Sequence, residues 1–232
     1  MNDKKQNKSK YSLMIKSIIL ILLGITGFGS LLFISAGTFR YWNTWLFLAA
    51  FFIPDILLII YLFFKDPELL RKRLNSDEKE KVQALVSLLY RLTGVLVMLL
   101  SGLNYRFGWS EVPIPAVIGA AVIMVLGFSL SGVVMRQNRF ASRTIEIQNG
   151  QKVIDTGLYS VIRHPMYLSG LLLYCPMPLV LGSVYVFILT LIITPFLMAI
   201  RILNEEKVLK EQLAGYEEYM QKVPYRMIPF IW

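Results

Sequence analysis

The chemically distinctive stretch of this chain is residues 154–170, IDTGLYSVIRHPMYLSG, which contains the only histidine, His164. Arg163, His164 and Tyr167 bring hydrogen-bond donors and acceptors to the beginning of a long apolar run. Pro165 lacks an N–H and has a fixed φ, which is typical of the first position of a helix. The stretch is therefore predicted to bind a polar cofactor at a membrane surface. A basic rim at the start of a membrane helix is the simpler interpretation of the same residues.

A second polar cluster follows the same apolar run. Arg201 and Glu205 are four residues apart, so on a helix their side chains share one face, whereas Glu206 points elsewhere. A snorkelling arginine at the end of a membrane helix would also give this pattern. If the apolar run folds back on itself, this cluster and the one around His164 lie at one membrane depth, where a mixed-charge ligand could contact both.

The composition is that of an integral membrane protein. Hydrophobic residues make up 56% of the 232 residues, the mean hydropathy is +0.57, and several uncharged runs have the ~20 residues needed to cross a bilayer. The net charge of +9 comes from basic residues between these runs, so it indicates membrane orientation rather than nucleic-acid binding. The single cysteine, Cys175, lies in an apolar run, which excludes an internal disulfide and favours simple packing. The chain contains no metal-ligand spacing.

We predict one membrane domain over residues 1–232, with four spans and their loops in 1–136 and the cofactor-binding region in 137–232. The four spans are 12–34, 42–64, 84–109 with Arg91 at its cytosolic rim, and 113–135. The charged segment 65–83 is predicted to be a solvated connection at the level of the lipid headgroups.

Asp55 lies inside the second span, next to Pro54. An intramembrane carboxylate is costly and usually faces the interior of a helix bundle, so Asp55 is a functional candidate. A hydrogen-bonded contact between helices beside a proline kink is the simpler interpretation.

The run from 165 to 200 contains no charged residue. At ~1.5 Å per residue a single helix of this length would be ~54 Å long, well beyond the ~30 Å hydrocarbon core of a bilayer. Proline and glycine between 176 and 183 predict a break, and hence a hairpin of short helices at about 167–180 and 184–203. Residues 204–222 have apolar side chains at three- and four-residue spacing, which predicts an amphipathic carboxyl-terminal helix. The expected fold is an all-α integral membrane protein with about six transmembrane helices.

The distribution of basic residues predicts how the bundle is oriented. With a cytosolic amino terminus, all 24 Lys and Arg residues except Arg40 and Arg106 lie in the inner segments. This asymmetry follows the positive-inside rule, so both termini of this multi-pass protein of the cell membrane are predicted to be cytoplasmic. The clusters around His164 and Arg201 then share the cytoplasmic face, where we expect the site.

Three motifs in residues 137–232 resemble the isoprenylcysteine carboxyl methyltransferase family, specifically its bacterial members. They are TGLYSVIRHPMYLSG, RILNEE after an uncharged hairpin, and GYEEYMQKVPYRMIPF. RHP followed at this distance by RxxxEE and YxxYxxxVP is a fairly specific combination. Residues 1–136 resemble the family only in being apolar helices.

The resemblance implies that S-adenosylmethionine binds in a cytosol-facing pocket and that a lipophilic acceptor reaches it from the bilayer. The residues implied to contact the cofactor are Gln151, Lys152, Val153, Ile154, Tyr159, His164, Pro165, Met166, Tyr167 and Glu205. Arg201 matches the family arginine that faces the acceptor, and Gln148 fills another family contact if the loop lengths agree. The expected partners are this acceptor and membrane lipids, with no nucleic acid and no metal, and the oligomeric state is left open.

The implied activity is methyl transfer to a carboxylate of an isoprenyl-cysteine-like or other lipid acceptor. A carboxylate is ionised at neutral pH and needs no general base, and Arg201 could hold it through paired hydrogen bonds. Methylation of a phospholipid amine is the second hypothesis, and it would need a base such as His164, Asp55 or a glutamate.

Two hypotheses come from other classes of protein. The closing VPYRMIPF also resembles the carboxyl end of membrane sterol reductases, which use NADPH, and Arg136, Arg139 and Arg143 could contact the phosphates of that cofactor. A scaffold or transporter is the other hypothesis, although the spans show no inverted repeat.

Overall fold

The computed structural model describes residues 2–75, 80–141, 144 and 147–232, with side chains described from residue 10 onward. Over these residues the chain forms helices and no strand, and it is an all-α integral membrane protein. The long helices are α1 (Asn2–Ala36), α2 (Trp42–Lys65), α4 (Lys81–Phe107), α5 (Ile114–Gln137) and α8 (Val184–Gln212). The short helices are α3 (Pro67–Arg73), η1 (Gly157–Ser160), α6 (Pro165–Tyr174), α7 (Met177–Val180) and α9 (Tyr216–Lys222).

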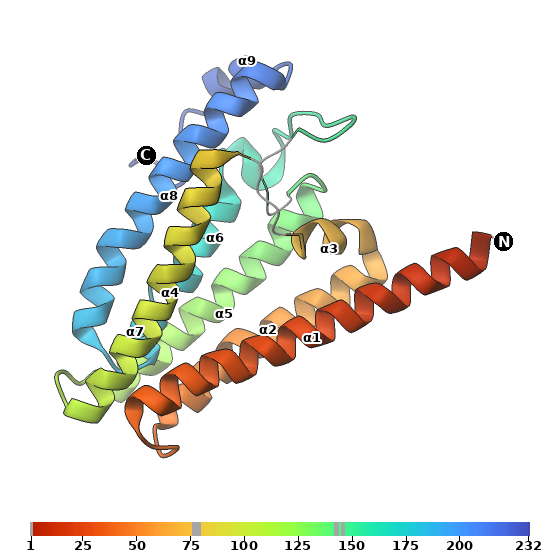
Figure 1. Ribbon diagram of the computed structural model, residues 1–232. Helices are drawn as coiled ribbons and strands as arrows, with labels where there is room; N and C mark the ends of the chain where they lie inside the picture. Colours follow the sequence, from red (N-terminus) through yellow and green to blue (C-terminus); the bar gives the residue numbers. More distant parts are fainter. Residues whose placement is uncertain (1, 76–79, 142–143, 145–146) are drawn as a thin grey trace.

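Five of these helices are long and apolar enough to cross a membrane, namely α1 from Lys10 onward, α2, α4, α5 and α8. The shorter apolar segment Pro165–Val180 forms α6 and α7, which connect α5 to α8 (Figure 1). At its end, Asn43 Nδ2 donates to the carbonyl oxygen of Val180 at 2.8 Å, and Asn104 Nδ2 donates to that of Gly182 at 3.2 Å. These bonds hold the turn after α7 beside the beginning of α2 and the end of α4. The predicted fold-back of the uncharged run is therefore confirmed.

The charged segment 65–83 was predicted to be a solvated connection, but it contains the helix α3. Asp66 precedes α3, and its side chain accepts the N–H of Leu69 at 3.1 Å. Pro67 occupies the first helical position, where its missing N–H leaves no donor unsatisfied. An N-cap and a proline at N1 are local helix-start signals, and they explain why α3 forms here.

The carboxyl-terminal helices also differ from the predicted bounds. α8 continues to Gln212, so residues 204–212 extend a membrane helix instead of beginning an amphipathic one. No proline or glycine interrupts this part of the chain before Gly215, which has a φ of 82°. Only α9 forms a separate helix after that residue.

The long helices form a wedge that is closed at one end and open at the other (Figure 1). At the closed end α4 crosses α1 so tightly that a Cβ on Gly102 would lie 1.8 Å from Ser35 Oγ. Midway along α5, a Cβ on Gly127 would lie 3.0 Å from the backbone of Ser169 and Leu173 in α6. From the closed end α1 and α2 diverge from α4 and α8, and the open end carries α9. Glycine permits the close crossings, and the divergence leaves space between the helices.

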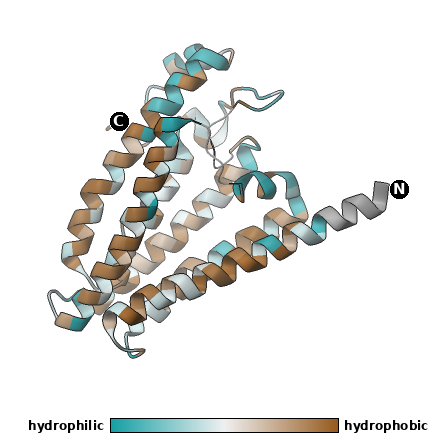
Figure 2. Ribbon diagram, in the orientation of Figure 1, coloured by the Kyte–Doolittle hydropathy of each residue, from teal (hydrophilic) through white to brown (hydrophobic). Residues whose placement is uncertain are grey.

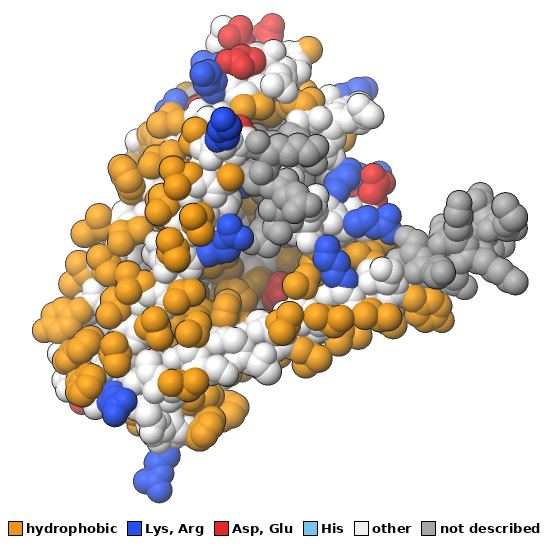
Figure 3. All heavy atoms as spheres, in the orientation of Figure 1, with side chains coloured by type: hydrophobic (Ala, Val, Ile, Leu, Met, Phe, Trp, Pro, Cys, Tyr) orange, Lys and Arg blue, Asp and Glu red, His pale blue; other side chains and the backbone are white. Residues whose placement is uncertain are grey.

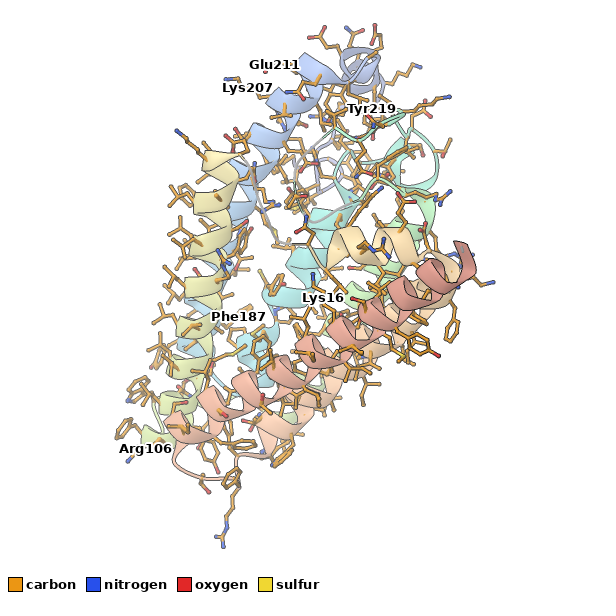
Figure 4. The ribbon with its side chains drawn as sticks, turned by 45° about the vertical axis from the view of Figure 1, so that its right-hand side comes forward. Lys16, Arg106, Phe187, Lys207, Glu211 and Tyr219 are labelled. Carbon is orange, nitrogen blue, oxygen red and sulfur yellow. The ribbon has the colours of Figure 1, made fainter. Side chains whose placement is uncertain are left out.

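The two ends of the wedge differ in polarity. Apolar residues dominate the middle of α1, α2, α4 and α8, whereas α3 and α9 are hydrophilic (Figure 2). Hydrophobic side chains cover the visible faces of α1, α4 and α8, and charged side chains gather near α3 and α9 (Figure 3). Arg106 lies at the closed end, and Lys207 and Glu211 lie at the open end (Figure 4). The apolar middle is the part that a bilayer would surround.

Gly102→Ala is expected to destabilise the protein, because the added methyl group would displace Ser35 or separate α1 from α4. Overpacking of this kind costs about 1–3 kcal/mol, and it should lower the thermal unfolding midpoint of the purified protein in detergent. Gly119→Ala on α5 is the matched control, since its Cβ would meet no atom within 4 Å. Equal midpoints for the two variants would contradict the tight crossing of α1 and α4.

Candidate functional site

A cavity of about 740 Å³ lies inside the wedge. Its wall includes residues of α1, α2, α4, α5, α6 and α8 and of the connection between α5 and α6. Arg201 and all of the predicted cofactor contacts except Pro165 line this cavity. The fold thus brings to one space residues that are far apart in the sequence, while their roles stay predictions.

A chain of hydrogen bonds joins α6 and α8 on the cavity wall. Tyr167 Oη donates to Glu205 Oε2 at 2.6 Å, and Arg201 Nε donates to Tyr167 Oη at 3.0 Å. Arg201 Nη1 also donates to Ser87 Oγ on α4 at 2.9 Å. Arg201 and Glu205 stand one turn apart on α8, and Tyr167 lies in the first turn of α6. These bonds hold a guanidinium and a carboxylate in fixed positions beside the cavity.

Glu206 lies outside the cavity lining and is buried, with 4% of its surface exposed. Its Oε1 accepts from Arg163 Nε at 2.7 Å and lies 3.2 Å from His164 Nε2. Its Oε2 accepts from Arg226 Nε at 2.9 Å. Sequence reasoning missed this carboxylate because it followed only the face of α8 that carries Arg201. Three basic residues in largely apolar surroundings were the signal that a buried acid had to be present.

The carboxyl-terminal segment 223–226 is bound to the start of α6. Arg163 Nη1 donates to two carbonyl oxygens of this segment, at 2.7 and 2.9 Å. The backbone N–H groups of Arg163 and His164 donate to two more, at 2.9 and 2.7 Å. The imidazole of His164 contacts the ring of Tyr167 edge-on, with 5.6 Å between the ring centroids. The segment therefore helps to hold the histidine beside the hydrogen-bonded chain.

Tyr159 lies in η1, within the connection between α5 and α6, and is buried on the cavity wall. Asn138 Nδ2 donates to its hydroxyl at 3.0 Å, and Tyr219 Oη on α9 donates to its backbone carbonyl at 2.7 Å. Burial raises the pKa of Tyr159 to about 12, so its hydroxyl stays neutral at physiological pH. Gly157 in the preceding turn has a φ of 61°, and a Cβ there would lie 2.7 Å from the Gln137 side chain. Glycine is therefore required at this turn.

Two predicted contacts do not line the cavity. Gln148 lies against α3, where its Oε1 accepts from Lys72 Nζ at 2.7 Å. Pro165 is buried at the first position of α6 and supports the lining residues that follow it. Neither residue offers a polar group to the cavity.

Other residues considered from the sequence also lie away from the cavity. Asp55 is half-buried on α2 and does not line it. Arg136 and Arg139 do not line it either, and Arg139 Nε donates to Asp66 Oδ2 at 3.0 Å. Arg143 lies outside the described residues. The arginines suggested for a nucleotide phosphate are thus not gathered at this site in the part of the chain that is described.

Comparison with protein families gives a matching family model. Residues 115–215 match the model described as phospholipid methyltransferase. This family belongs to the same group as the isoprenylcysteine carboxyl methyltransferases. The matched region runs from α5 through α8 and includes Tyr167, Arg201 and Glu205. The match supports a membrane methyltransferase.

A partial similarity connects the chain to a reductase. Delta(14)-sterol reductase TM7SF2 of Mus musculus is 29% identical over 91 residues, which cover 38% of this chain and 22% of that protein. The chain thus matches about a fifth of the length of this curated relative. The similarity is compatible with the reductase hypothesis but does not outweigh the family match.

Proposed function

We propose that this chain transfers a methyl group from S-adenosylmethionine to a carboxylate of a lipophilic acceptor, isoprenyl-cysteine-like or another lipid acid. The observation that supports this most directly is the hydrogen-bonded chain Arg201–Tyr167–Glu205 on the cavity wall. Phe28 and Leu31 of α1 line the same cavity. One ligand could therefore have its polar group at Arg201 and its apolar part between the helices.

The open end of the cavity fits the groups that S-adenosylmethionine presents. Glu205 offers a carboxylate for an ammonium group, and Tyr159, His164 and residues 151–154 offer hydrogen-bonding groups for a nucleoside. When bound, S-adenosylmethionine supplies a methyl group on a sulfonium, whose C–S bond breaks as an acceptor oxygen forms the new C–O bond.

Arg201 is assigned to the acceptor carboxylate. The planar fork of a guanidinium matches the geometry of a carboxylate, and the bonds from Arg201 to Tyr167 and Ser87 fix the direction of this fork. The carboxylate is already ionised, so the protein has to orient its oxygen and exclude water rather than remove a proton.

Methylation of a phospholipid amine is the alternative that the name of the matching family favours. An amine must lose a proton before it attacks, so this reaction needs a base on the cavity wall. Among the described lining residues the carboxylate is that of Glu205, which accepts a hydrogen bond from Tyr167. The imidazole of His164 lies 3.2 Å from Glu206. Because both candidate bases have structural partners, the carboxylate acceptor ranks first.

We further propose that the open end of the wedge faces the cytoplasm of a cell membrane, with both ends of the chain on that side. Arg40 lies in the connection after α1 and Arg106 in the last turn of α4, both at the closed end, and the other Lys and Arg residues belong to the segments predicted to be inside. This asymmetry supports the orientation through the positive-inside rule. The acceptor would then react at the inner leaflet.

Membranes that contain the protein are expected to transfer label from methyl-labelled S-adenosylmethionine to the lipid fraction, and mild alkali should release it. Alkali converts a methyl ester into volatile methanol, whereas the label of a methylated amine stays non-volatile, so non-volatile label after alkali would establish the amine alternative instead. Glu205→Gln should weaken cofactor binding about tenfold, because it removes the charge that an ammonium group would contact. Glu211→Gln, at an exposed position of the same helix, is the matched control.

The labelling assay, together with a measurement of NADPH binding, separates the methyltransferase from the reductase. Binding of NADPH to the purified protein, with no label transferred from S-adenosylmethionine, would overturn the proposal in favour of a reductase. Transfer of label to protein instead of lipid would retain the methyltransferase and change its acceptor.

A further inference from the structure

We propose that Arg91 on α4 binds a phosphate of the lipid acceptor, one helical turn deeper in the cavity than the position of Arg201. This inference rests on the proposed function, because it adds a second contact to the same acceptor. It also names the acceptor class, a lipid whose headgroup carries a carboxylate beyond its phosphate.

Arg91 is a charged residue within the apolar sequence SLLYRLTGVL of α4. Its side chain is exposed and lines the cavity. Over the residues that the structure describes, no hydrogen bond or ion pair joins its guanidinium to another protein group. Arginine in a membrane span is costly, and it is usually found facing a cavity or pairing with an anion. The exposed guanidinium of Arg91 is therefore available to an anionic ligand that enters the cavity.

The charge of the cavity wall points to the same kind of ligand. Among the described lining residues the basic side chains are Arg73, Arg91, Lys152, Arg163 and Arg201, and the acidic one is Glu205. Arg163 is compensated behind the wall by Glu206, at 2.7 Å. Basic side chains on a cavity wall attract anionic ligands. A carboxylate at Arg201 and a phosphate at Arg91 would each place a negative charge beside a basic side chain of this wall.

The geometry of α4 relates the two arginines to each other. Arg91 follows Ser87 by four residues, so their side chains share one face of α4 with about 5–6 Å between their Cβ atoms. Ser87 Oγ accepts from Arg201 Nη1 at 2.9 Å, which puts the Arg201 guanidinium at the level of Ser87. Since α4 runs from the open end to the closed end, Arg91 lies deeper (Figure 1). The spacing suits a headgroup whose carboxylate and phosphate are separated by a few bonds.

Beyond Arg91 the cavity continues into apolar surroundings. A Cβ on Gly94 would meet no atom within 4 Å, so there is open space beside this turn of α4. Val97 and Met98 of α4 and Phe28 of α1 line the cavity further on. From the open end inward, the residues of the wall are thus placed to contact first the reacting group of the lipid, then its phosphate and then its acyl chain. This is the order of the groups in a phospholipid with a carboxylate on its headgroup.

The test measures binding of short-chain lipids to the full chain in a neutral detergent, by calorimetry. Dihexanoyl phosphatidylglycerol, which has a phosphodiester and no carboxylate, should bind the wild type, and Arg91→Gln should weaken this binding about tenfold or more. Arg91→Lys should retain much of the affinity. Lys81→Gln, at an exposed basic position of the same helix outside the cavity lining, is the matched control. Equal affinity of the wild type and Arg91→Gln would overturn the proposal.

Two further parts of the experiment distinguish a lipid phosphate from free phosphate and locate the acyl chain of the lipid. Dihexanoylglycerol, which lacks a phosphate, should bind the wild type and Arg91→Gln equally. Inorganic phosphate should not displace the lipid, and displacement at equal concentration would show a site for free phosphate instead. Gly94→Leu should weaken the binding of both lipids, because the new side chain fills the space assigned to the acyl chain. Normal lipid binding by this variant would contradict the path along α4.

Lipid binding and methyl transfer fail separately. Arg91-dependent lipid binding without label transfer from S-adenosylmethionine would refute the proposed function and retain the phosphate site. Label transfer together with a lipid affinity that does not depend on Arg91 would retain the proposed function and refute the phosphate site.

Discussion

Arg201→Lys is expected to lower the rate of methyl transfer about a hundredfold, while the affinity for S-adenosylmethionine stays unchanged. The ammonium of lysine is a single point of charge, and it cannot reproduce the rigid fork that donates to Tyr167 and Ser87. An acceptor carboxylate would still be attracted to the site, but its reacting oxygen would lose a defined direction. The loss should therefore appear in turnover and not in cofactor binding.

Turnover of methyl-labelled cofactor in lipid nanodiscs measures the rate of methyl transfer, and calorimetry measures the affinity for S-adenosylmethionine. Lys207→Gln is the matched control, because it removes an exposed charge from the same helix. Normal turnover by Arg201→Lys would refute the assignment of this residue to the acceptor. A parallel loss of cofactor affinity would assign it to the cofactor.

The second large effect is expected from Glu206→Gln, which should lower the free energy of unfolding by about 3–5 kcal/mol. The volume of the side chain hardly changes, but Arg163, with 6% of its surface exposed, loses its anionic partner and stays buried. Arg226 loses the same partner. The attachment of segment 223–226 to the start of α6 should then weaken, because Glu206 no longer holds the Arg163 side chain that donates to two of its carbonyl oxygens.

Thermal unfolding of the purified protein in detergent tests the stability, and limited proteolysis of residues 223–232 tests the attachment of the segment. Glu211→Gln again serves as the control, since it removes a carboxylate from an exposed position of α8. An unchanged midpoint together with a protected segment would show that Glu206 does not stabilise this part of the fold.

Sequence reasoning was most effective where local rules decide the structure. Arg201 and Glu205 are four residues apart on an uninterrupted helix, and the length of the run from 165 to 200 requires the chain to fold back. These two facts suffice to bring α6 and the end of α8 to one level. Tyr167 then contacts both side chains in the structure.

The same local rules explain two of the errors. Asp66 and Pro67 signal the start of α3, but the high charge of segment 65–83 was interpreted as a solvated connection. The helical pattern after Asn204 continues that of α8 without a break, but the onset of charge was interpreted as the start of a new element. In both places the charge pattern was given more weight than the helix signals.

The part of the cavity wall that α1 provides could not be predicted from the sequence. Phe28 lines it because α1 crosses α4 at Gly102 and then diverges. Local patterns identify membrane helices, but they do not specify which pairs cross or at which residue. Glu206 was missed for a related reason, since Arg226 comes from a segment whose docking no local rule predicts.

Glu205 and Glu206 are consecutive residues with partners on different sides of α8. Successive side chains of an α-helix point about 100° apart, so both sets of bonds form at only one angular setting of the helix about its axis. Rotation that improved one set would break the other. A displacement of the carboxyl-terminal segment would therefore rotate α8 about its axis and move Arg201, without any molecule entering the cavity.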